Sequence, residues 1–302
     1  LSLAYGKRSL WDIYQFLRFE NLNVNLEKLL DCFKAFEKCK FISTRPVIKS
    51  SDLSRAFKQV GVKPGMTLMV HTGVSQFGYL DMGMTGLINQ LEKAVGIKGT
   101  LCMPTHSLSF SGSNPYNKKK SISTVGALTN AFIRMPDVYR SAHPTHSVAC
   151  KGPKATALIK GHHAACPPQG ETGFWGNFLA DDAWVLMMAP MGTNTLIHLA
   201  ENLEGIPTPA GFIPKKKDGK WQHRECPNMP MNTHWFDKVH DLLDRKKLLK
   251  RVVLGESEIV LMRAQDVIDA ATVILKKNPY IVLNGTEGVW NTAVKKNLDS
   301  IY

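Results

Sequence analysis

The chain lacks several patterns that would place it in a common protein class. No apolar run approaches the roughly 18 residues that a membrane-spanning helix needs, and residues 1–19 mix charged and apolar side chains instead of forming a signal peptide. No GxGxxG motif or P-loop follows a predicted strand, and no GxSxG nucleophile elbow is present. These absences argue against a membrane span, a standard dinucleotide-binding fold and a typical serine hydrolase.

Cysteine is also scarce. The six cysteines are scattered, none forms a Cys-x-x-Cys motif, and no cysteine–histidine cluster has the spacing of a zinc site. We therefore expect no metal site. Scattered thiols in a chain of 302 residues predict reduced cysteines and a cytoplasmic location. Cys102 and Cys150 lie in apolar runs and are predicted to be inert core residues.

Acidic residues are in the minority. There are 25 of them against 38 basic ones, which gives a formal net charge of +13. This excess favours an anionic ligand: a nucleotide-type cofactor, a nucleotide-linked substrate, nucleic acid or an anionic membrane. The basic runs at residues 118–120, 215–217 and 245–251 are also typical of solvated surface, and they lack the interleaved aromatic residues of nucleic-acid modules. We therefore expect no nucleic-acid partner.

The hydrophobic content of 44% is sufficient for a sizeable core. Residues 1–45 carry apolar side chains at helical spacing and are predicted to form an N-terminal helical extension. Packing on the main domain is the default expectation for these helices. A homodimer is the alternative that would bury the same apolar faces.

The main domain, residues 46–302, alternates predicted strands and helices. Apolar runs predict strands over residues 66–70, 100–104, 184–189 and 258–262, and amphipathic spacing predicts helices over 52–60, 83–95, 124–134, 153–161, 235–249 and 264–276. The strand–helix–strand order across residues 66–104 predicts a parallel pair. A turn at residues 218–219 predicts a hairpin. Residues 162–177 are predicted to be loop, with Phe174 and Trp175 exposed. The predicted fold class is α/β, with a mixed central sheet flanked by helices.

The most informative segment is residues 192–201, which follows the predicted strand 184–189. Asn194 or Thr195 is placed to cap a helix that starts at once. On this helix, His198 and Glu201 lie three residues apart and share a face. The segment predicts a histidine base at the exit of a strand, where ligands bind in open α/β sheets. A core histidine beside a surface glutamate is the alternative interpretation of these residues alone.

Three other loops contain candidate site residues. Residues 71–78 combine glycines and hydroxyls that suit a phosphate or a pantetheine amide, although a tight strand-to-helix turn uses the same residues. Residues 104–107 follow a strand directly. Residues 143–147 place two histidines three apart, without the further ligand that a metal site needs.

These residues favour direct group transfer over a covalent intermediate. Ser147 with His198 lacks a nucleophile elbow, which argues against a serine hydrolase. What remains is a histidine base surrounded by hydroxyl and amide donors. Such a base removes a proton from an amine or hydroxyl, which attacks an activated acyl group.

At these motifs the chain resembles the aminoglycoside 3-N-acetyltransferase family, whose members use acetyl-coenzyme A (acetyl-CoA). The matching segments occur in family order at residues 69–78, 99–105, 140–147 and 194–201. The resemblance implies the mixed α/β fold of this family, with an acyl-CoA-dependent N-acetyltransferase domain over residues 46–302. It also implies transfer within a ternary complex, without an acyl-enzyme.

The resemblance implies roles for the candidate residues. His198 is the implied general base, and we expect Glu201 to orient it. The residues expected to bind the cofactor are His71, Thr72, Gly73, Val74, Ser75 and Thr105. The residues expected to bind the acceptor are His106, His143, His146, Asn194 and Glu225.

Two departures from the family pattern concern the acceptor. Gly192 stands where family members commonly carry Asp, and residues 225–234 offer only Glu225 as a carboxylate. On a chain of net charge +13, a polycation meets an unfavourable potential. We therefore expect the acceptor to be an amino sugar or similar small amine, including a nucleotide-linked sugar. The alternatives are an aminoglycoside-modifying enzyme of antibiotic resistance and a non-enzymatic basic module that binds an anionic polymer.

Overall fold

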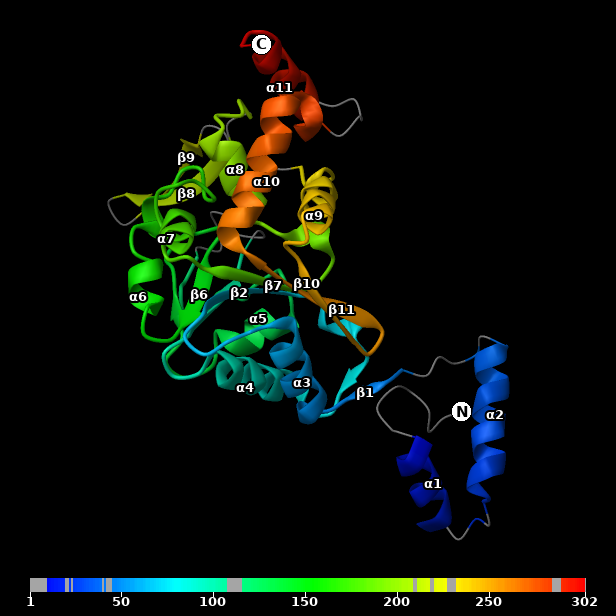
Figure 1. Ribbon diagram of the computed structural model, residues 1–302. Helices are drawn as coiled ribbons and strands as arrows, with labels where there is room; N and C mark the ends of the chain where they lie inside the picture. The colour runs from blue at the N-terminus through cyan, green and yellow to red at the C-terminus, as the bar shows by residue number, and fades with distance from the viewer. Residues whose placement is uncertain are drawn as a thin grey trace. The chain divides into compact units, whose positions relative to one another are not determined.

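Figure 1 shows the protein as a computed structural model, which describes residues 10–19, 22, 24–39, 41, 45–107, 116–208, 211–217, 220–226, 232–283 and 289–301. The chain divides into two compact units, Leu1–Pro46 and Val47–Tyr302. The first unit contains helices α1 (Leu10–Phe19) and α2 (Leu26–Lys38). Asn25 caps α2, because its side-chain oxygen accepts the N–H of Lys28 at 3.2 Å.

The second unit is built on a seven-stranded mixed sheet with the order β10-β11-β7-β2-β4-β6-β5. Its strands are β2 (Thr67–Thr72), β4 (Thr100–Pro104), β5 (Tyr139–Arg140), β6 (Val148–Lys151), β7 (Trp184–Met188), β10 (Lys250–Leu254) and β11 (Ser257–Arg263). Strand β2 pairs in parallel with β4 and with β7, and the other neighbours are antiparallel. The predicted parallel pair is therefore confirmed.

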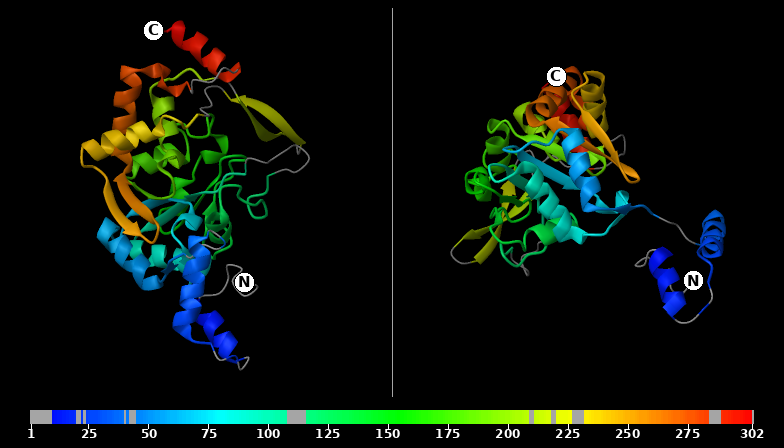
Figure 2. Two further views of the ribbon diagram at one scale, coloured as in Figure 1. Left: turned by 90° about the vertical axis from the view of Figure 1, so that its right-hand side faces the viewer. Right: turned by 60° about the horizontal axis from the view of Figure 1, so that its bottom comes forward.

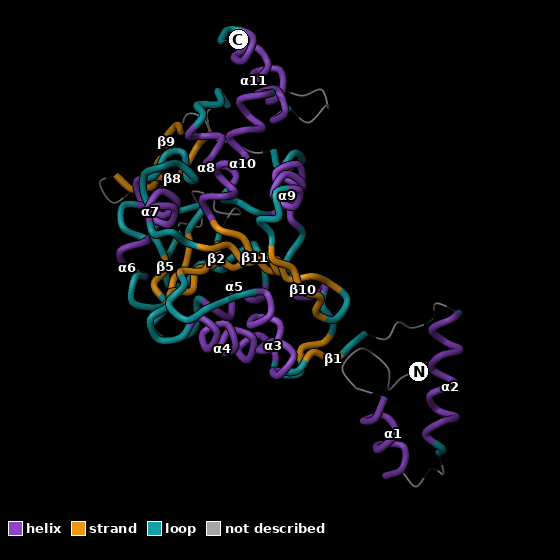
Figure 3. The backbone as a smooth tube through the Cα atoms, in the orientation of Figure 1, coloured by secondary structure: helices purple, strands orange, loops and turns teal. Residues whose placement is uncertain are grey.

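Helices cover both faces of this sheet (Figures 1 and 3). One face carries α3 (Ser50–Val60), α4 (Gly83–Val95) and α5 (Ala127–Phe132), and the other carries α8 (Ile197–Leu203), α9 (Phe236–Arg245) and α10 (Ala264–Lys277). Side chains alternate between the two cores along β2: Leu68 and Val70 pack with α3 and α4, and Met69 packs on the opposite face. The predicted fold class, a mixed sheet flanked by helices, is confirmed.

The remaining elements lie at the margins of the sheet. They are the helices α6 (Ala155–Leu158), α7 (Phe174–Ala180) and α11 (Val289–Asp299), the parallel pair β1 (Val47–Ile48) and β3 (Tyr79–Leu80), and the antiparallel hairpin β8 (Gly211–Lys217) and β9 (Lys220–Cys226). Figure 2 shows this hairpin, in yellow, as an arm at the side of the second unit. The hairpin prediction is confirmed, and its turn at residues 218–219 lies outside the described residues.

The prediction of a loop over residues 162–177 was wrong at both ends: residues 162–164 form a 3-10 turn and residues 174–177 belong to α7, whereas residues 165–173 are loop. Helix α7 begins at Phe174, and both Phe174 and Trp175 are completely buried instead of exposed. Gly173 allows this packing, because it has a positive φ of 94° and a Cβ there would lie 2.7 Å from the Cα of His162. Prolines and glycines in this stretch therefore accompany a tightly packed turn instead of an open loop.

Several helix boundaries also differ from prediction, and the helices predicted over residues 124–134 and 153–161 are the shorter α5 and α6. Neither Asn194 nor Thr195 is the N-cap of α8, which begins at Ile197 after the 3-10 turn Met191–Thr193. The helix predicted to reach residue 249 ends at Arg245, and the unpredicted strand β10 follows. Within the described part of the chain, no helix is both long enough and apolar enough to cross a membrane.

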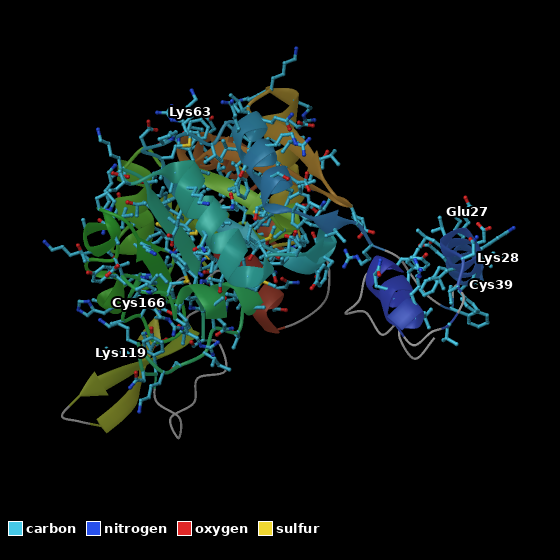
Figure 4. All side chains as sticks on the ribbon, turned by 90° about the horizontal axis from the view of Figure 1, so that it is seen from below. Glu27, Lys28, Cys39, Lys63, Lys119 and Cys166 are labelled. Atoms are coloured by element: carbon cyan, nitrogen blue, oxygen red, sulfur yellow. A yellow bond between two sulfur atoms is a disulfide. The ribbon has the colours of Figure 1, made fainter. Side chains whose placement is uncertain are left out.

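The cysteines follow the sequence prediction only in part. Cys102 and Cys150 are completely buried and face each other across β4 and β6, and burial raises the pKa of the Cys102 thiol well above its ordinary value. Cys166 and Cys226, however, form a disulfide between the segment before α7 and the end of β9. Figure 4 shows Cys166 beside the hairpin. The expectation that all cysteines are reduced was therefore wrong for this pair.

We predict that this disulfide stabilises the second unit. It closes a segment with a sequence separation of 60 residues, so breaking it increases the entropy of the unfolded chain. Cys166→Ser should lower the free energy of unfolding in urea by about 2–4 kcal/mol, and dithiothreitol should do the same to the unmodified protein. The exposed, unbonded Cys32 provides the control variant Cys32→Ser. An unchanged free energy after both treatments would show that the bond contributes nothing.

Candidate active site

The site centres on a hydrogen-bonded histidine–glutamate pair at the start of α8. Strand β7 ends at Met188, a short turn follows, and His198 is the second residue of the helix. Glu201 lies one turn later on the same face, and its Oε2 is 2.7 Å from His198 Nδ1. Their side chains are only 6% and 3% exposed. The shared helix face predicted for these residues is thus observed, and the pair is buried.

The Glu201 carboxylate has a second partner. Its Oε1 accepts the indole N–H of Trp235 at 2.8 Å, just before α9 begins. A carboxylate accepts hydrogen bonds, so its contact with Nδ1 places the imidazole proton on that nitrogen. The other ring nitrogen, Nε2, then carries the lone pair, and it forms no hydrogen bond within the described part of the chain. This arrangement orients one basic nitrogen.

The ring of His198 also packs against an aromatic wall. Its centroid lies 4.9 Å from that of Phe236 in an edge-to-face geometry, and Phe236 in turn packs edge-to-face on Trp235. Trp235 therefore takes part both in holding Glu201 and in building the wall beside His198. It was not predicted as a site residue, because an indole 34 positions away from Glu201 leaves no local pattern in the sequence.

Four further histidines form a histidine cluster next to this pair: His106, His143, His146 and His162. Ring centroids are 4.8 Å apart for His106–His146, 5.9 Å for His143–His146 and 5.1 Å for His143–His162. Burial lowers the pKa of His146 to about 3, and a charge on His198 lowers it further. The cluster therefore lies within electrostatic reach of the pair.

Hydrogen bonds determine the protonation of two cluster members. His143 Nδ1 accepts the backbone N–H of His146 at 3.0 Å, so this nitrogen carries no proton. His162 Nε2 donates to the carbonyl of Pro168, and its Nδ1 accepts from the Ser141 hydroxyl, which itself accepts the N–H of Val148. Both imidazoles are consequently neutral. His162, which was not predicted as a site residue, supports the neighbouring Ser141.

Two further buried histidines lie on neighbouring elements: His71 on β2 and His240 on α9. Burial, followed by the charge of His240, lowers the pKa of His71 to about 3, and burial lowers that of His240 to about 4. The Asn194 amide donates to His240 Nε2 at 3.3 Å, and its oxygen accepts the N–H of Leu196. Asn194, which was predicted to bind the acceptor substrate, is completely buried. Its hydrogen bonds brace the turn before α8 against α9.

The predicted cofactor residues occupy two different environments. His71 is buried at the end of β2, whereas Thr72, Gly73 and Val74 are half-buried and Ser75 is exposed. Thr105, after β4, is completely buried, and its hydroxyl contacts the carbonyl and hydroxyl oxygens of Ser147. Thr105 directly precedes His106 of the histidine cluster, and the Thr105 side chain supports the end of β4. Cofactor contact by these residues stays a prediction.

The residues predicted to bind the acceptor substrate are only partly brought together. His106, His143 and His146 share the histidine cluster, as the ring distances show. Glu225 is exposed at the end of β9, away from the histidine cluster's ring contacts, and is followed by the disulfide-bonded Cys226. Among the residues that the structure describes, no group of three or more histidine, cysteine or acidic side chains is arranged to hold a metal ion.

Comparison with known proteins connects this geometry to a family. Residues 69–276 match the family model described as aminoglycoside 3-N-acetyltransferase. Aminoglycoside N(3)-acetyltransferase IV from Salmonella sp is 30% identical over 249 residues, covering 80% of this chain and 92% of that protein. The YokD protein of Bacillus subtilis (strain 168), an aminoglycoside N(3')-acetyltransferase-like protein, is 24% identical over 262 residues, covering 76% and 92%.

Solved structures give the same result. The aminoglycoside acetyltransferase AAC(3)-IVa apoenzyme superimposes with a TM-score of 0.76 at 26% identity, covering 84% of this chain and 99% of that chain. A histidine-to-alanine variant of the same enzyme, solved in complex with a gentamicin, gives a TM-score of 0.77 at 27% identity with the same coverage.

We predict steep acid destabilisation from the buried neutral histidines. The folded-state pKa values of His71, His162 and His240 lie near 3 to 4, below the ordinary value of 6.5. The unfolded chain therefore binds protons first as the pH falls below 6.5, so stability is full above that pH and is lost towards pH 4. Between pH 7.5 and 5.5 each of these three histidines should cost about 1.4 kcal/mol, so the loss should be roughly 4 kcal/mol or more, because the pKa values of His106 and His146 are lowered in the same direction.

The measurement is urea unfolding at the two pH values. The variant His163→Ala, which removes an exposed histidine next to His162, should show the same loss as the unmodified chain. A free energy of unfolding that stays constant between pH 7.5 and 5.5 would contradict the neutral buried state assigned to these side chains.

Proposed function

The chain belongs to the aminoglycoside 3-N-acetyltransferase family, and from this premise we propose that it transfers the acetyl group of acetyl-CoA directly to an amine of a small acceptor, with His198 as the general base. The observation that carries this proposal is the relay Trp235–Glu201–His198, in which both carboxylate oxygens are occupied and one imidazole nitrogen is left free to accept a proton. The enzyme class, an N-acetyltransferase that uses acetyl-CoA, follows from the family.

The proposed reaction is a single displacement at the thioester carbonyl. The acceptor amine attacks the carbonyl carbon, and His198 Nε2 takes the proton that the nitrogen loses as its bond to carbon forms. The C–S bond then breaks, and the imidazolium returns the proton to the departing coenzyme A thiolate. The products are an amide and free coenzyme A, and the imidazole is regenerated. Holding both substrates together supplies much of the rate.

Glu201 is proposed to serve the base in two ways. Its bond to Nδ1–H keeps Nε2 as the proton acceptor, and its negative charge stabilises the imidazolium formed during transfer. The Trp235 N–H fixes the carboxylate itself, because it occupies the oxygen that His198 does not use. Glu201 thereby acts through His198 and does not need to touch the substrate.

Coenzyme A is proposed to approach along the ends of β2 and β4. His71 Nε2 and His106 Nε2 are buried and have no hydrogen-bond partner within the described part of the chain. Buried polar atoms are rarely left unpaired, so these nitrogens suit the amides of the pantetheine arm. The partly exposed backbone of Thr72, Gly73 and Val74, together with Ser75, completes the predicted contact surface.

The acceptor is proposed to carry its amine on a sugar or aminocyclitol ring. AAC(3)-IVa structures contain a gentamicin or apramycin, which supports an aminoglycoside. The net charge of +13 instead favours a less cationic amino sugar, including a nucleotide-linked one. Among the described residues, the carboxylate at the base is Glu201, and its oxygens are both occupied.

We propose an acetyltransferase domain over residues 46–302 preceded by a helical extension over residues 1–45. Dimer formation through that extension and a cytoplasmic location also stay predictions, and the Cys166–Cys226 bond removes part of the basis for the latter. Membership of an enzyme family sets aside the non-enzymatic polymer-binding module.

Removing the base tests the mechanism. His198→Ala should lower kcat about 10²–10⁴-fold, the usual contribution of a positioned general base, while the KM for acetyl-CoA changes little. Glu201→Gln should give a smaller loss, because the base remains but its proton is no longer fixed. Turnover is followed as thiol released from acetyl-CoA with an amine acceptor. His163→Ala, at an exposed histidine, is the matched control and should retain activity. Full activity of His198→Ala would exclude His198 as the base.

Salt dependence distinguishes the two acceptor classes. Raising the ionic strength screens the positive potential of the protein. The value of kcat/KM should therefore rise with salt for polycationic gentamicin or apramycin, fall for an amino sugar linked to a nucleoside diphosphate, and stay nearly constant for glucosamine. A fall with salt for the aminoglycosides would show that local negative charge at the acceptor site outweighs the net charge.

A further inference from the structure

Arg140 is a buried cation on the edge strand β5, and no role in the site has been assigned to it above. The residue is only 4% exposed. Its guanidinium donates to the carbonyl of Thr105 at 2.6 Å, to the hydroxyls of Ser107 at 2.9 Å and Ser147 at 3.0 Å, to the hydroxyl of Thr105 at 3.2 Å, and to the carbonyl of Ser121. All three guanidinium nitrogens therefore have acceptors.

None of these acceptors is charged. Within the described residues, no carboxylate forms an ion pair with Arg140, and burial lowers the pKa of its guanidinium. The guanidinium lies 5.2 Å from the centroid of the Tyr116 ring, and the Tyr116 hydroxyl donates to the carbonyl of Ser141 at 2.8 Å. Burying a cation without a counter-ion is costly, so a residue that only filled space would be better apolar.

The acceptors of Arg140 lie directly beside two members of the histidine cluster. Thr105 and Ser107 flank His106, and Ser147 follows His146. The rings of His106 and His146 are 4.8 Å apart, and His146 is within electrostatic reach of His198. One planar side chain thus joins the end of β4 to the start of β6. It holds together the two loops that carry these imidazoles.

We propose that Arg140 is a positioning residue for acetyl transfer: its guanidinium fork sets the His106–His146 pair beside His198. The inference rests on the proposed role of His198 as the base. The half-exposed His146 is further fixed by a 2.8 Å contact between its Nδ1 and the Thr145 hydroxyl. A lysine keeps the charge of Arg140 but has no planar fork, so it does not reach all of these acceptors at once.

The test uses Arg140→Lys and Arg140→Met in the full chain. Displacement of reacting groups by about 1 Å can cost roughly 10²-fold in rate, so both variants should lose about 10²-fold in kcat, with a smaller change in the KM for acetyl-CoA. In spectra of the protein without substrates, the imidazole NMR resonances of His106 and His146 should shift, and that of exposed His163 should not. Ser107→Ala removes one acceptor and should move the same resonances if the Arg140 variants do not fold.

A cavity variant on the opposite sheet face controls for stability. Leu53 is completely buried in the core under α3, so Leu53→Ala should lower the Tm without lowering kcat. The proposal is overturned if folded Arg140→Lys keeps kcat within twofold, if the two resonances do not move, or if Leu53→Ala loses as much kcat at the same loss of Tm. An active His198→Ala variant would show that His198 is not the general base. The resonance shifts would still test whether Arg140 positions His106 and His146.

Discussion

A single buried carboxylate organises the candidate site. Glu201 accepts one hydrogen bond from His198 on its own helix and another from Trp235 at the entry to α9. These two bonds join α8 to α9 and leave Glu201 no free oxygen for a substrate. They also decide which nitrogen of His198 is basic, since a buried imidazole otherwise exchanges its proton between two positions. The orientation of His198 and of the Trp235–Phe236 wall beside it therefore depends on this carboxylate.

Hydrogen-bond partners separate the roles of chemically identical side chains. His162 uses both ring nitrogens, and His143 uses Nδ1 to hold the backbone of its own loop. Each of these imidazoles is neutral, because one of its ring nitrogens accepts a hydrogen bond. His198 differs, because its Nδ1 donates to a carboxylate while its Nε2 forms no hydrogen bond within the described part of the chain. Whether a histidine in this site can transfer a proton therefore depends on whether its second ring nitrogen is free of hydrogen bonds.

Elements with strong local periodicity could be predicted from the sequence. Strand β4 and helix α4 were predicted with the observed bounds, because their apolar patterns coincide with burial on one face or both. The segment before α7 could not be predicted, because its prolines and glycines indicate a loop while Phe174 and Trp175 reach a distant core. The start of α8 was also misplaced, because the Asn194 side chain bonds His240 and the N–H of Leu196 in a turn that precedes the helix.

The candidate site was predictable where its residues are neighbours in sequence. His198 and Glu201 share a helix face by spacing alone, and His143 and His146 share a short turn. Trp235, Arg140, His162 and the Cys166–Cys226 bond depend on contacts between segments that are distant along the chain, which no local pattern encodes. Residues 71–75 and Thr105 were correctly located beside strand ends, and their roles toward coenzyme A remain proposals.

The most direct measurement is a crystal structure of the ternary complex with coenzyme A and an amine acceptor. We expect the acceptor nitrogen to lie about 3 Å from His198 Nε2, with the coenzyme A sulfur on the far side of that nitrogen and Glu201 still bonded to Nδ1. A complex in which His198 remains covered by protein, with the sulfur and the amine bound elsewhere, would contradict it.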